Sequence, residues 1–156
     1  MRAYADSSFI LRLIIMEPGS PETVAEYRRL GTPRLFFLPL HALEVGNGIR
    51  QRAFHQRRST LSGERQHVAR ERDAALERLE HLVRPHTLLE VSADMEGVIS
   101  RAVQLSAAYS ERIGARAIDL LHVAAALTLE SELFLTTDGR QAELAKAEGL
   151  KVASVA

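Results

Sequence analysis

Cysteine is absent from this chain of 156 residues, and its formal net charge is zero. Without cysteine there can be no disulfide scaffold, no thiolate zinc site and no cysteine nucleophile. Because 20 basic residues balance 20 acidic ones, the charge of the whole chain gives no argument for a nucleic-acid partner. Repeats, linkers and low-complexity segments are lacking too, so the length predicts a single domain over residues 1–156.

The sequence also has no apolar run of the length that a bilayer requires. Residues 9–16 form an apolar stretch, but it is too short to span a membrane and Arg12 interrupts it. It follows Asp6 rather than a basic leader, and no small-residue cleavage site comes after it. We therefore expect a cytoplasmic protein without a membrane segment, and the absence of cysteine fits a reducing compartment.

Short apolar runs alternate with segments of helical periodicity. One helix face is marked by apolar residues three and four positions apart, and Gly149 is a typical stop for the last helix. Strands that alternate with helices predict an α/β fold with a parallel sheet covered on both faces. Five strands are expected, at residues 2–5, 35–38, 88–91, 133–136 and 151–155.

Two glycines interrupt the helix that is predicted to start near Pro39. Gly46 and Gly48 each cost about 1 kcal/mol relative to alanine in a helix interior. Either another backbone or a substrate packs closely there, or this helix is looser than its neighbours.

A basic helical arm is expected around residues 50–84, although the total charge is zero. The first part of this segment contains two acidic residues, Glu64 and Glu71, and seven arginines. The arginines are Arg50, Arg52, Arg57, Arg58, Arg65, Arg70 and Arg72. Arginine neutralises phosphates and releases counterions, so the candidate RNA contacts are Asn47, Arg50, Arg57 and Arg58. The alternative is a solvated helical surface, since Phe54 is the one aromatic residue available there for stacking.

Two aspartates follow predicted strands. Asp6 comes directly after the first strand, and Asp138 comes after the fourth, in Thr136-Thr137-Asp138-Gly139. Each could simply cap a helix or make a turn. However, the carboxyl ends of parallel strands lie at one edge of a sheet, where α/β proteins bind ligands.

Two further acids lie within about two turns of their predicted helix starts. Glu44 could be a solvated surface residue, which is the common fate of a helical glutamate. Asp119 lies in a helix that is apolar almost all round, so its ionised form needs a partner. That partner is a metal ion, or it is Arg116 or His122 on the same helix face.

If Asp6, Glu44, Asp119 and Asp138 meet, their charges must be compensated. Two like charges 4 Å apart repel by about 4 kcal/mol at an effective dielectric near 20. The cluster would therefore bind one or two divalent cations or have raised pKa values. Oxygen-only ligands suit Mg²⁺ or Mn²⁺.

Three neighbours of these acids have less specific interpretations. Ser7 and Ser8 could hydrogen-bond a carboxylate or cap the helix, and we favour the cap. His122 could be a general acid or a phosphate contact. Its apolar neighbours favour a packed core histidine.

These motifs, in this order along the chain, resemble the PIN-domain ribonuclease family, and most of all the VapC-type toxins of VapBC toxin–antitoxin pairs. The resemblance covers essentially the whole chain, and its most specific part surrounds Asp119 and Asp138. The segments that carry it are Tyr4-Ala5-Asp6-Ser7-Ser8, Leu43-Glu44-Val45 with Asn47, the run from Ala117 to Ala126, Thr136-Thr137-Asp138-Gly139-Arg140, and Gly149-Leu150-Lys151-Val152.

The resemblance implies a three-layer α/β/α fold and a metal-dependent endoribonuclease. The metal ligands would be Asp6, Glu44, Asp119 and Asp138, holding Mg²⁺ or Mn²⁺. It also implies an RNA substrate, a VapB-like antitoxin and a homodimer. Phe9, Leu13 and Leu30 could contribute to the dimer interface, although core packing suits them better.

Two departures from the family pattern matter. Many members have a further acid shortly after the fourth one, whereas Gly139-Arg140-Gln141 has none, which puts a second metal in doubt. The stretch from Arg50 to His81 is longer and more basic than a minimal member needs, which bears on RNA or antitoxin contacts. The alternative function is a non-catalytic PIN-fold module that binds RNA or protein.

Overall fold

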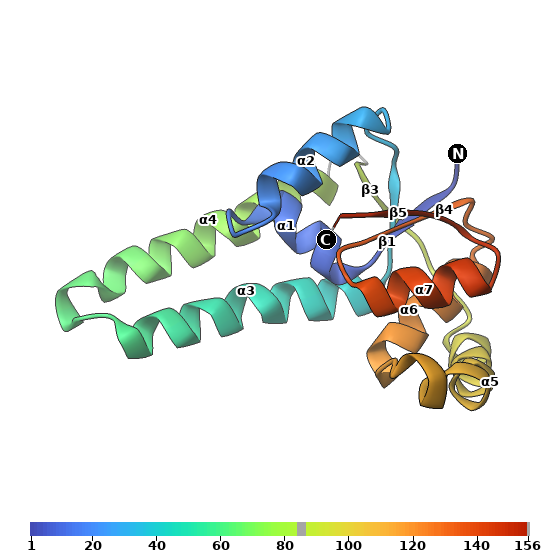
Figure 1. The fold of residues 1–156 in the computed structure, drawn as a ribbon. Coiled ribbons are helices and arrows are strands. Elements are labelled where there is room, and N and C mark those ends of the chain that lie inside the picture. The colour runs from blue at the N-terminus through green and yellow to red at the C-terminus, as the bar shows by residue number, and fades with distance from the viewer. Residues whose placement is uncertain (84–86, 156) are drawn as a thin grey trace.

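The computed structural model describes residues 1–83 and 87–155, and its centre is a five-stranded parallel sheet (Figure 1). The strand order is β3-β2-β1-β4-β5, with every neighbouring pair parallel. Each of the five predicted strands is present within one residue of its expected ends, so the predicted α/β fold class is confirmed. The strands are β1 (Ala3–Ala5), β2 (Leu35–Phe37), β3 (Leu88–Glu90), β4 (Leu133–Thr136) and β5 (Lys151–Ser154).

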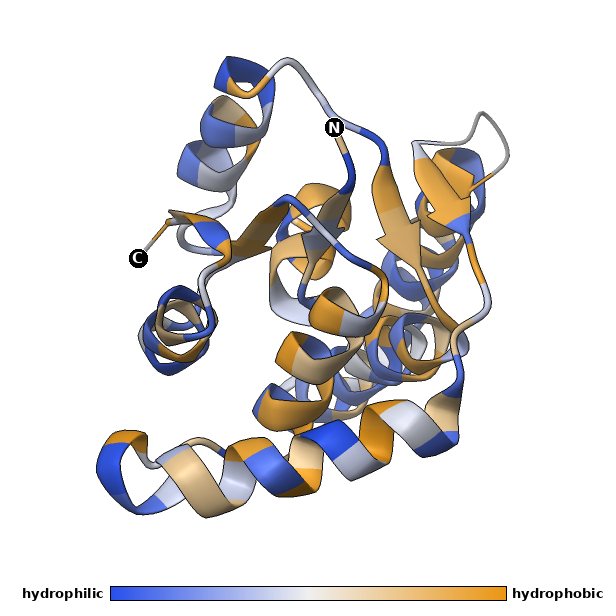
Figure 2. Cartoon of the chain, turned by 90° about the vertical axis from the view of Figure 1, so that its right-hand side faces the viewer, coloured by the Kyte–Doolittle hydropathy of each residue, from blue (hydrophilic) through white to orange (hydrophobic). Residues whose placement is uncertain are grey.

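Side chains of the central strands alternate between two hydrophobic layers, as the two-residue period of a strand requires. Ala3, Ala5 and Leu135 face one layer, whereas Tyr4 and Phe134 face the other. Figure 2 shows the strands as mainly hydrophobic, in keeping with a sheet buried on both sides. Among residues 1–83 and 87–155, no helix is both long enough and apolar enough to cross a membrane.

In the described residues, seven α-helices enclose the sheet and make the α/β/α layers. Helices α1 to α4 supply the layer that includes Phe9 and Ile49. Helices α5 to α7 supply the layer that includes Val123 and Leu144. Their bounds are α1 (Ser7–Ile14), α2 (Ser20–Arg29), α3 (Pro39–Ser59), α4 (Arg65–Val83), α5 (Met95–Ile113), α6 (Ala117–Thr128) and α7 (Gly139–Ala147).

The predicted basic arm is a helical hairpin that projects from the body. Figure 1 shows α3 and α4 side by side and pointing away from the sheet, and the short helix Ser62–Glu64 joins them. Helix α4 continues to Val83, whereas residue 84, the last of the expected arm, lies outside the described residues.

The two glycines of α3 lie inside a continuous helix, so the looser-helix alternative is wrong. A β-carbon on Gly48 would lie 3.3 Å from the Leu11 side chain, which shows that α1 packs closely against α3 at this point. A β-carbon on Gly46 would instead meet the flexible end of Arg50. The close approach at Gly48 is therefore made by the side chain of Leu11, and not by another backbone or a substrate as expected.

Candidate functional site

Asp6 is both a helix cap and a buried acid. Its Oδ1 accepts the main-chain N–H of Phe9 at 2.8 Å, which caps α1 and satisfies one of the free donors of its first turn. Ser8 donates to both carboxylate oxygens. The side chain is almost fully buried, and this burial raises the pKa of the Asp6 carboxyl although these hydrogen bonds act to lower it.

Thr136, the last residue of β4, connects Asp6 with Asp138. Its hydroxyl donates to Oδ2 of Asp6 at 2.7 Å and accepts the main-chain N–H of Asp138 at 2.9 Å. Asp138 Oδ1 in turn caps α7 by accepting the N–H groups of Arg140 and Gln141. Both strand-end aspartates therefore lie at the same edge of the sheet, as their positions predicted.

Glu44 reaches this edge from α3 and is not a freely solvated surface residue. Its Oε2 accepts the Ser7 hydroxyl at 2.8 Å and lies 2.5 Å from Nε2 of His122. Burial acts to raise the pKa of the Glu44 carboxyl, but the His122 hydrogen bond and charge and the Ser7 bond outweigh it. The net effect lowers the pKa, so Glu44 is held as a carboxylate.

His122 is buried, as its apolar neighbours predicted, but it also has polar partners. Its Nδ1 is hydrogen-bonded with the hydroxyl of Tyr4 at 2.8 Å, and its Nε2 faces Glu44. Burial raises the pKa of the Tyr4 hydroxyl well above its ordinary value, and the charges of Asp6 and Glu44 raise it further. Tyr4 therefore remains a neutral partner that fixes the orientation of the His122 ring.

A second buried histidine supports the start of α3. The main-chain N–H of Leu38 donates to Nδ1 of His41 at 2.9 Å, so the ring proton is on Nε2 and is donated to the carbonyl of Ala5. Burial, and after it the charge of His122, lowers the pKa of His41 to about 3. His41 is thus a neutral bridge between α3 and the end of β1.

Asp119 is fully buried and completely hydrogen-bonded. Its Oδ2 accepts the main-chain N–H of Arg116 at 2.9 Å, which closes the first turn of α6, and the Nε of the same residue at 3.1 Å. Its Oδ1 accepts Nη2 of Arg116 and the amide of Gln141 from α7. The ion pair with Arg116, which the sequence offered as an alternative to a metal ion, is present.

Arg116 also connects two of the four acids. Its Nη2 lies 3.5 Å from Oδ2 of Asp138, and the charge of Glu44 contributes, after Asp119 and Asp138, to raising the Arg116 pKa. In the described part of the chain, Arg116 is the one arginine or lysine within ion-pair distance of any of these acids. One guanidinium therefore faces several carboxylates, and the site has an excess of negative charge.

Asp6, Asp138 and Asp119 are connected through Thr136 and Arg116, whereas Glu44 is held separately by Ser7 and His122, so the four acids are not gathered around one point. Within residues 1–83 and 87–155, no three histidine or acidic side chains are arranged to hold a metal ion as they stand. The donor chemistry nevertheless fits a hard cation, because all four side chains offer carboxylate oxygens and one arginine neutralises only part of their charge.

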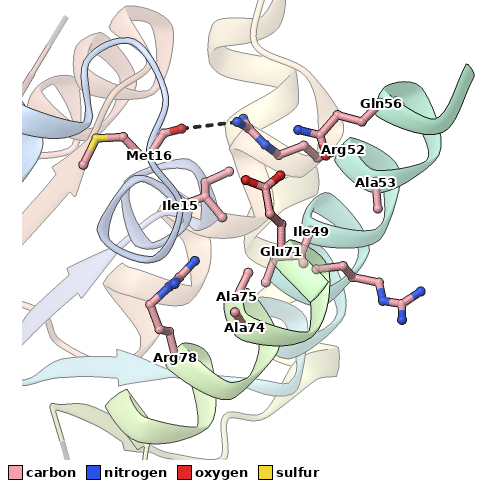
Figure 3. Close-up of a pocket in the computed structure, with 11 residues that line it drawn as sticks. Ile15, Met16, Ile49, Arg52, Ala53, Gln56, Glu71, Ala74, Ala75 and Arg78 are labelled. Carbon is pink, nitrogen blue, oxygen red and sulfur yellow. Dashed lines mark hydrogen bonds between the residues drawn. The ribbon is translucent and has the colours of Figure 1, made fainter. Parts of the chain in front are cut away.

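A separate hollow lies at the root of the arm, and it contains none of the four acids. Figure 3 shows it between the end of α1 and the facing sides of α3 and α4, where Arg52 donates to the carbonyl of Met16. Its walls combine apolar residues such as Ile15 and Ile49 with Arg72 and Arg78. This hollow is therefore distinct from the acidic site.

One interpretation of the neighbouring serines is wrong. We expected Ser7 and Ser8 to cap α1, but Asp6 is the cap, and the two hydroxyls bind the carboxylates of Glu44 and Asp6. A single residue can supply the cap, and Asp6 precedes the helix, so both serines are free to bind acids.

Three further residues hold side chains of the site, and the sequence did not predict their roles. Tyr4 of β1 binds His122. Thr136 of β4 binds Asp6, and Gln141 of α7 binds Asp119. Thr136 could have been noticed because it ends a strand two residues before Asp138. Nothing in the local sequence of Tyr4 or Gln141 indicates such contacts.

Among known protein families, the PIN domain matches residues 3–147 of this sequence. None of the curated proteins compared with the chain matches it. The family match includes all four acids, every strand but the last and every helix described above. Because it spans nearly the whole sequence, the chain belongs to the PIN domain family.

Proposed function

We propose that this protein is a metal-dependent endoribonuclease that hydrolyses RNA phosphodiester bonds, and that it is the toxin of a type II toxin–antitoxin pair. PIN domains are generally nucleases, which supports the reaction class. The observation that carries the proposal is the continuous network at one sheet edge. It connects Asp6 through Thr136 to Asp138, and Asp138 through Arg116 to Asp119.

The four acids would hold Mg²⁺ or Mn²⁺, as one or two ions. Asp6, Asp119 and Asp138 are the proposed direct ligands, and Glu44 would bind through water or orient the attacking water. A bound ion would acidify a water molecule and offset the negative charge that develops on the phosphate oxygens.

The chain's own groups prepare the reaction. Ser7 and His122 hold Glu44 in its ionised form, so its second oxygen can accept a proton from a water molecule. Tyr4 fixes the ring of His122 from the other side. The exposed side chain of Arg116 is placed to pair with a phosphate once it leaves the aspartates.

RNA cleavage by Asp119→Asn protein tests the assignment. Loss of one full carboxylate charge should reduce cleavage of a labelled RNA in Mn²⁺ by at least a hundredfold. Asp94→Asn is the matched control, because Asp94 is exposed and its side chain makes no capping bond. Since Asp119 is buried, circular dichroism melting must show that the variant is folded. A folded variant with wild-type activity would reject the role of Asp119.

A non-catalytic RNA- or protein-binding module is the second candidate. It is favoured by the Arg116 guanidinium, which already neutralises part of the acidic site without any metal. Calorimetric titration with Mn²⁺ separates the two candidates. Saturable binding supports the nuclease, whereas no heat of binding in a folded protein supports the module.

The proposed partners are a VapB-like antitoxin and a second copy of the chain. An antitoxin would cover the acidic edge, and an arginine from it would compete with the metal for Asp119 and Asp138. Phe9 is fully buried in the core, and Leu13 and Leu30 pack against the core, so these residues fit packing better than an interface. Co-purification of the product of a small upstream reading frame tests the antitoxin.

A further inference from the structure

The tip of the α3–α4 arm is not required by the hydrophobic core. From Phe54 to His67 no residue is buried, whereas Ala53 and Val68 on either side are. Figure 1 shows this end of the hairpin as the part of the chain farthest from the sheet. Burial therefore explains how the root of the arm folds but gives no reason for the residues at its tip.

The tip contains a hollow with an unusual lining. Three arginines surround it, Arg57, Arg58 and Arg65, together with Phe54 and the amide of Gln66. No acidic residue lines this hollow, and within the described chain none of the three arginines takes part in an ion pair. Three guanidinium groups around one shallow hollow, with no acidic residue in its lining, supply the positive charge that an anion requires.

Phe54 adds a second kind of contact. Its side chain is 54% exposed, which is high for a phenylalanine, and the guanidinium of Arg58 lies 5.6 Å from the centre of its ring. An exposed aromatic ring beside arginine offers a base a surface for stacking. The tip thus presents partners for both parts of a nucleotide, its phosphate and its base.

One face of α3 connects this hollow with the acidic site. Residues separated alternately by three and four positions lie on the same side of a helix. Such a stripe starts at Glu44 and continues through Asn47, Gln51, Phe54 and Arg58, with every member exposed or partly exposed. A polymer that leaves the acids can therefore follow α3 to the tip.

We propose that the arm tip is a second RNA-binding site, separate from the cleavage site, that takes phosphates and an unpaired base of single-stranded RNA. This inference rests on the proposed function for its choice of RNA. Arg58 is 14 residues after Glu44, which corresponds to about 21 Å along the helix. With phosphates about 3.4 Å apart along a stacked strand, about six nucleotides cover that distance.

The test measures RNA binding without cleavage. Fluorescence anisotropy is recorded for labelled single-stranded RNAs of 4 and 16 nucleotides with wild-type protein in EDTA, over a KCl titration. The double variant Arg58→Gln/Arg65→Gln removes two tip charges. Arg70→Gln/Arg101→Gln removes the same charge from exposed positions outside the hollow and is the matched control.

The tip variant should bind the 16-nucleotide RNA about tenfold more weakly than the control. Its slope of log Kd against log[KCl] should be lower by about 1.4, because each lost phosphate contact removes about 0.7. Phe54→Ala should weaken binding of the same RNA at least fivefold. The 4-nucleotide RNA is long enough to occupy the tip alone, so the tip variant should also bind it more weakly than the control.

Equal binding of the long RNA by tip and control variants would overturn the inference. If the tip variant lost binding to a poly-glutamate peptide but kept its RNA affinity, the inference would also be overturned. The tip would then be assigned to an acidic protein partner. Failure of the nuclease proposal gives a different result. Wild-type protein would then leave RNA intact in Mn²⁺, while the tip variants would still lose RNA affinity in EDTA.

Discussion

Arg116 donates to a single oxygen of Asp119 from both its main-chain N–H and its Nε, at 2.9 and 3.1 Å. The same guanidinium reaches Asp138, so one side chain supplies the positive charge between two acids. Arg116 is largely exposed, whereas Asp119 is not exposed at all. The cation can therefore leave toward solvent while the carboxylate stays in place.

Replacing Arg116 should strengthen metal binding. Arg116→Gln removes the resident cation that competes for Asp119 and Asp138, so affinity for Mn²⁺ should rise by about threefold to tenfold. Isothermal titration calorimetry measures this change, with Arg101→Gln on the exposed side of α5 as the control. Weaker or unchanged Mn²⁺ binding by a folded variant would show that Arg116 does not compete with the ion.

Removing the hydroxyl of Tyr4 should destabilise the protein. In Tyr4→Phe, the buried Nδ1 of His122 loses its hydrogen-bond partner, at a cost of about 1–3 kcal/mol in the free energy of unfolding. Urea denaturation followed by circular dichroism measures the effect. Tyr109→Phe should stay close to wild type, because its partner Glu148 remains in contact with water. Equal stabilities of the two variants would contradict the role of the Tyr4 hydroxyl.

His41 should make the metal-free protein less stable in mild acid. Its pKa is about 3 in the folded protein and about 6.5 when unfolded, so below pH 6.5 only the unfolded chain takes up the proton. Stability is therefore complete above pH 6.5 and falls as the pH decreases towards 3, by up to about 1.4 kcal/mol per pH unit.

The variant His41→Gln isolates this contribution, because an amide can still accept from Leu38 and donate to Ala5. Between pH 7.5 and 5.0, wild type should lose about 2 kcal/mol more unfolding free energy than the variant, measured by urea denaturation in EDTA. The raised pKa of Asp6 acts in the opposite direction, since its extra proton stabilises the fold at low pH, but it is common to both proteins. Parallel pH profiles would count against a neutral, buried His41.

Gly149 should be sensitive to the addition of one methyl group. It follows α7 with φ at 82°, and the N–H groups of Gly149 and Leu150 satisfy the last carbonyls of the helix. Gly149→Ala should lower the free energy of unfolding by about 1 kcal/mol, because alanine is strained in this conformation. Gly63→Ala is the control, since its φ is not positive and no atom would touch the new carbon. A thermal melt unchanged by the substitution at Gly149 would contradict the prediction.

The proposed homodimer has a candidate surface on α5. Ile99 and Val103 are 53% and 64% exposed and lie one turn apart on the same face. Ile99→Glu/Val103→Glu should convert a dimer to a monomer, as measured by light scattering after size exclusion. Ser100→Glu/Gln104→Glu places the same charges on the neighbouring face and should leave the dimer intact. A double variant that remains dimeric would remove this surface from the proposal.

The sequence was sufficient to predict the sheet and the edge at which Asp6 and Asp138 lie. Each of these acids follows a short apolar run, and parallel strands bring such ends to one edge whatever connects them. The burial of Asp119 was also predictable, because its helix is apolar on nearly every side. These properties depend on local pattern and on the geometry that all parallel sheets share.

The pairing of the acids was decided only by the tertiary structure. Ser7 binds Glu44 across 37 positions in sequence, and Thr136 binds Asp6 across 130, whereas local pattern had suggested that the serine would cap its own helix. Which donor reaches which carboxylate depends on how α3, α6 and α7 cross the sheet. Those crossings are set by packing in both hydrophobic layers at once, and a segment taken alone contains no information about them.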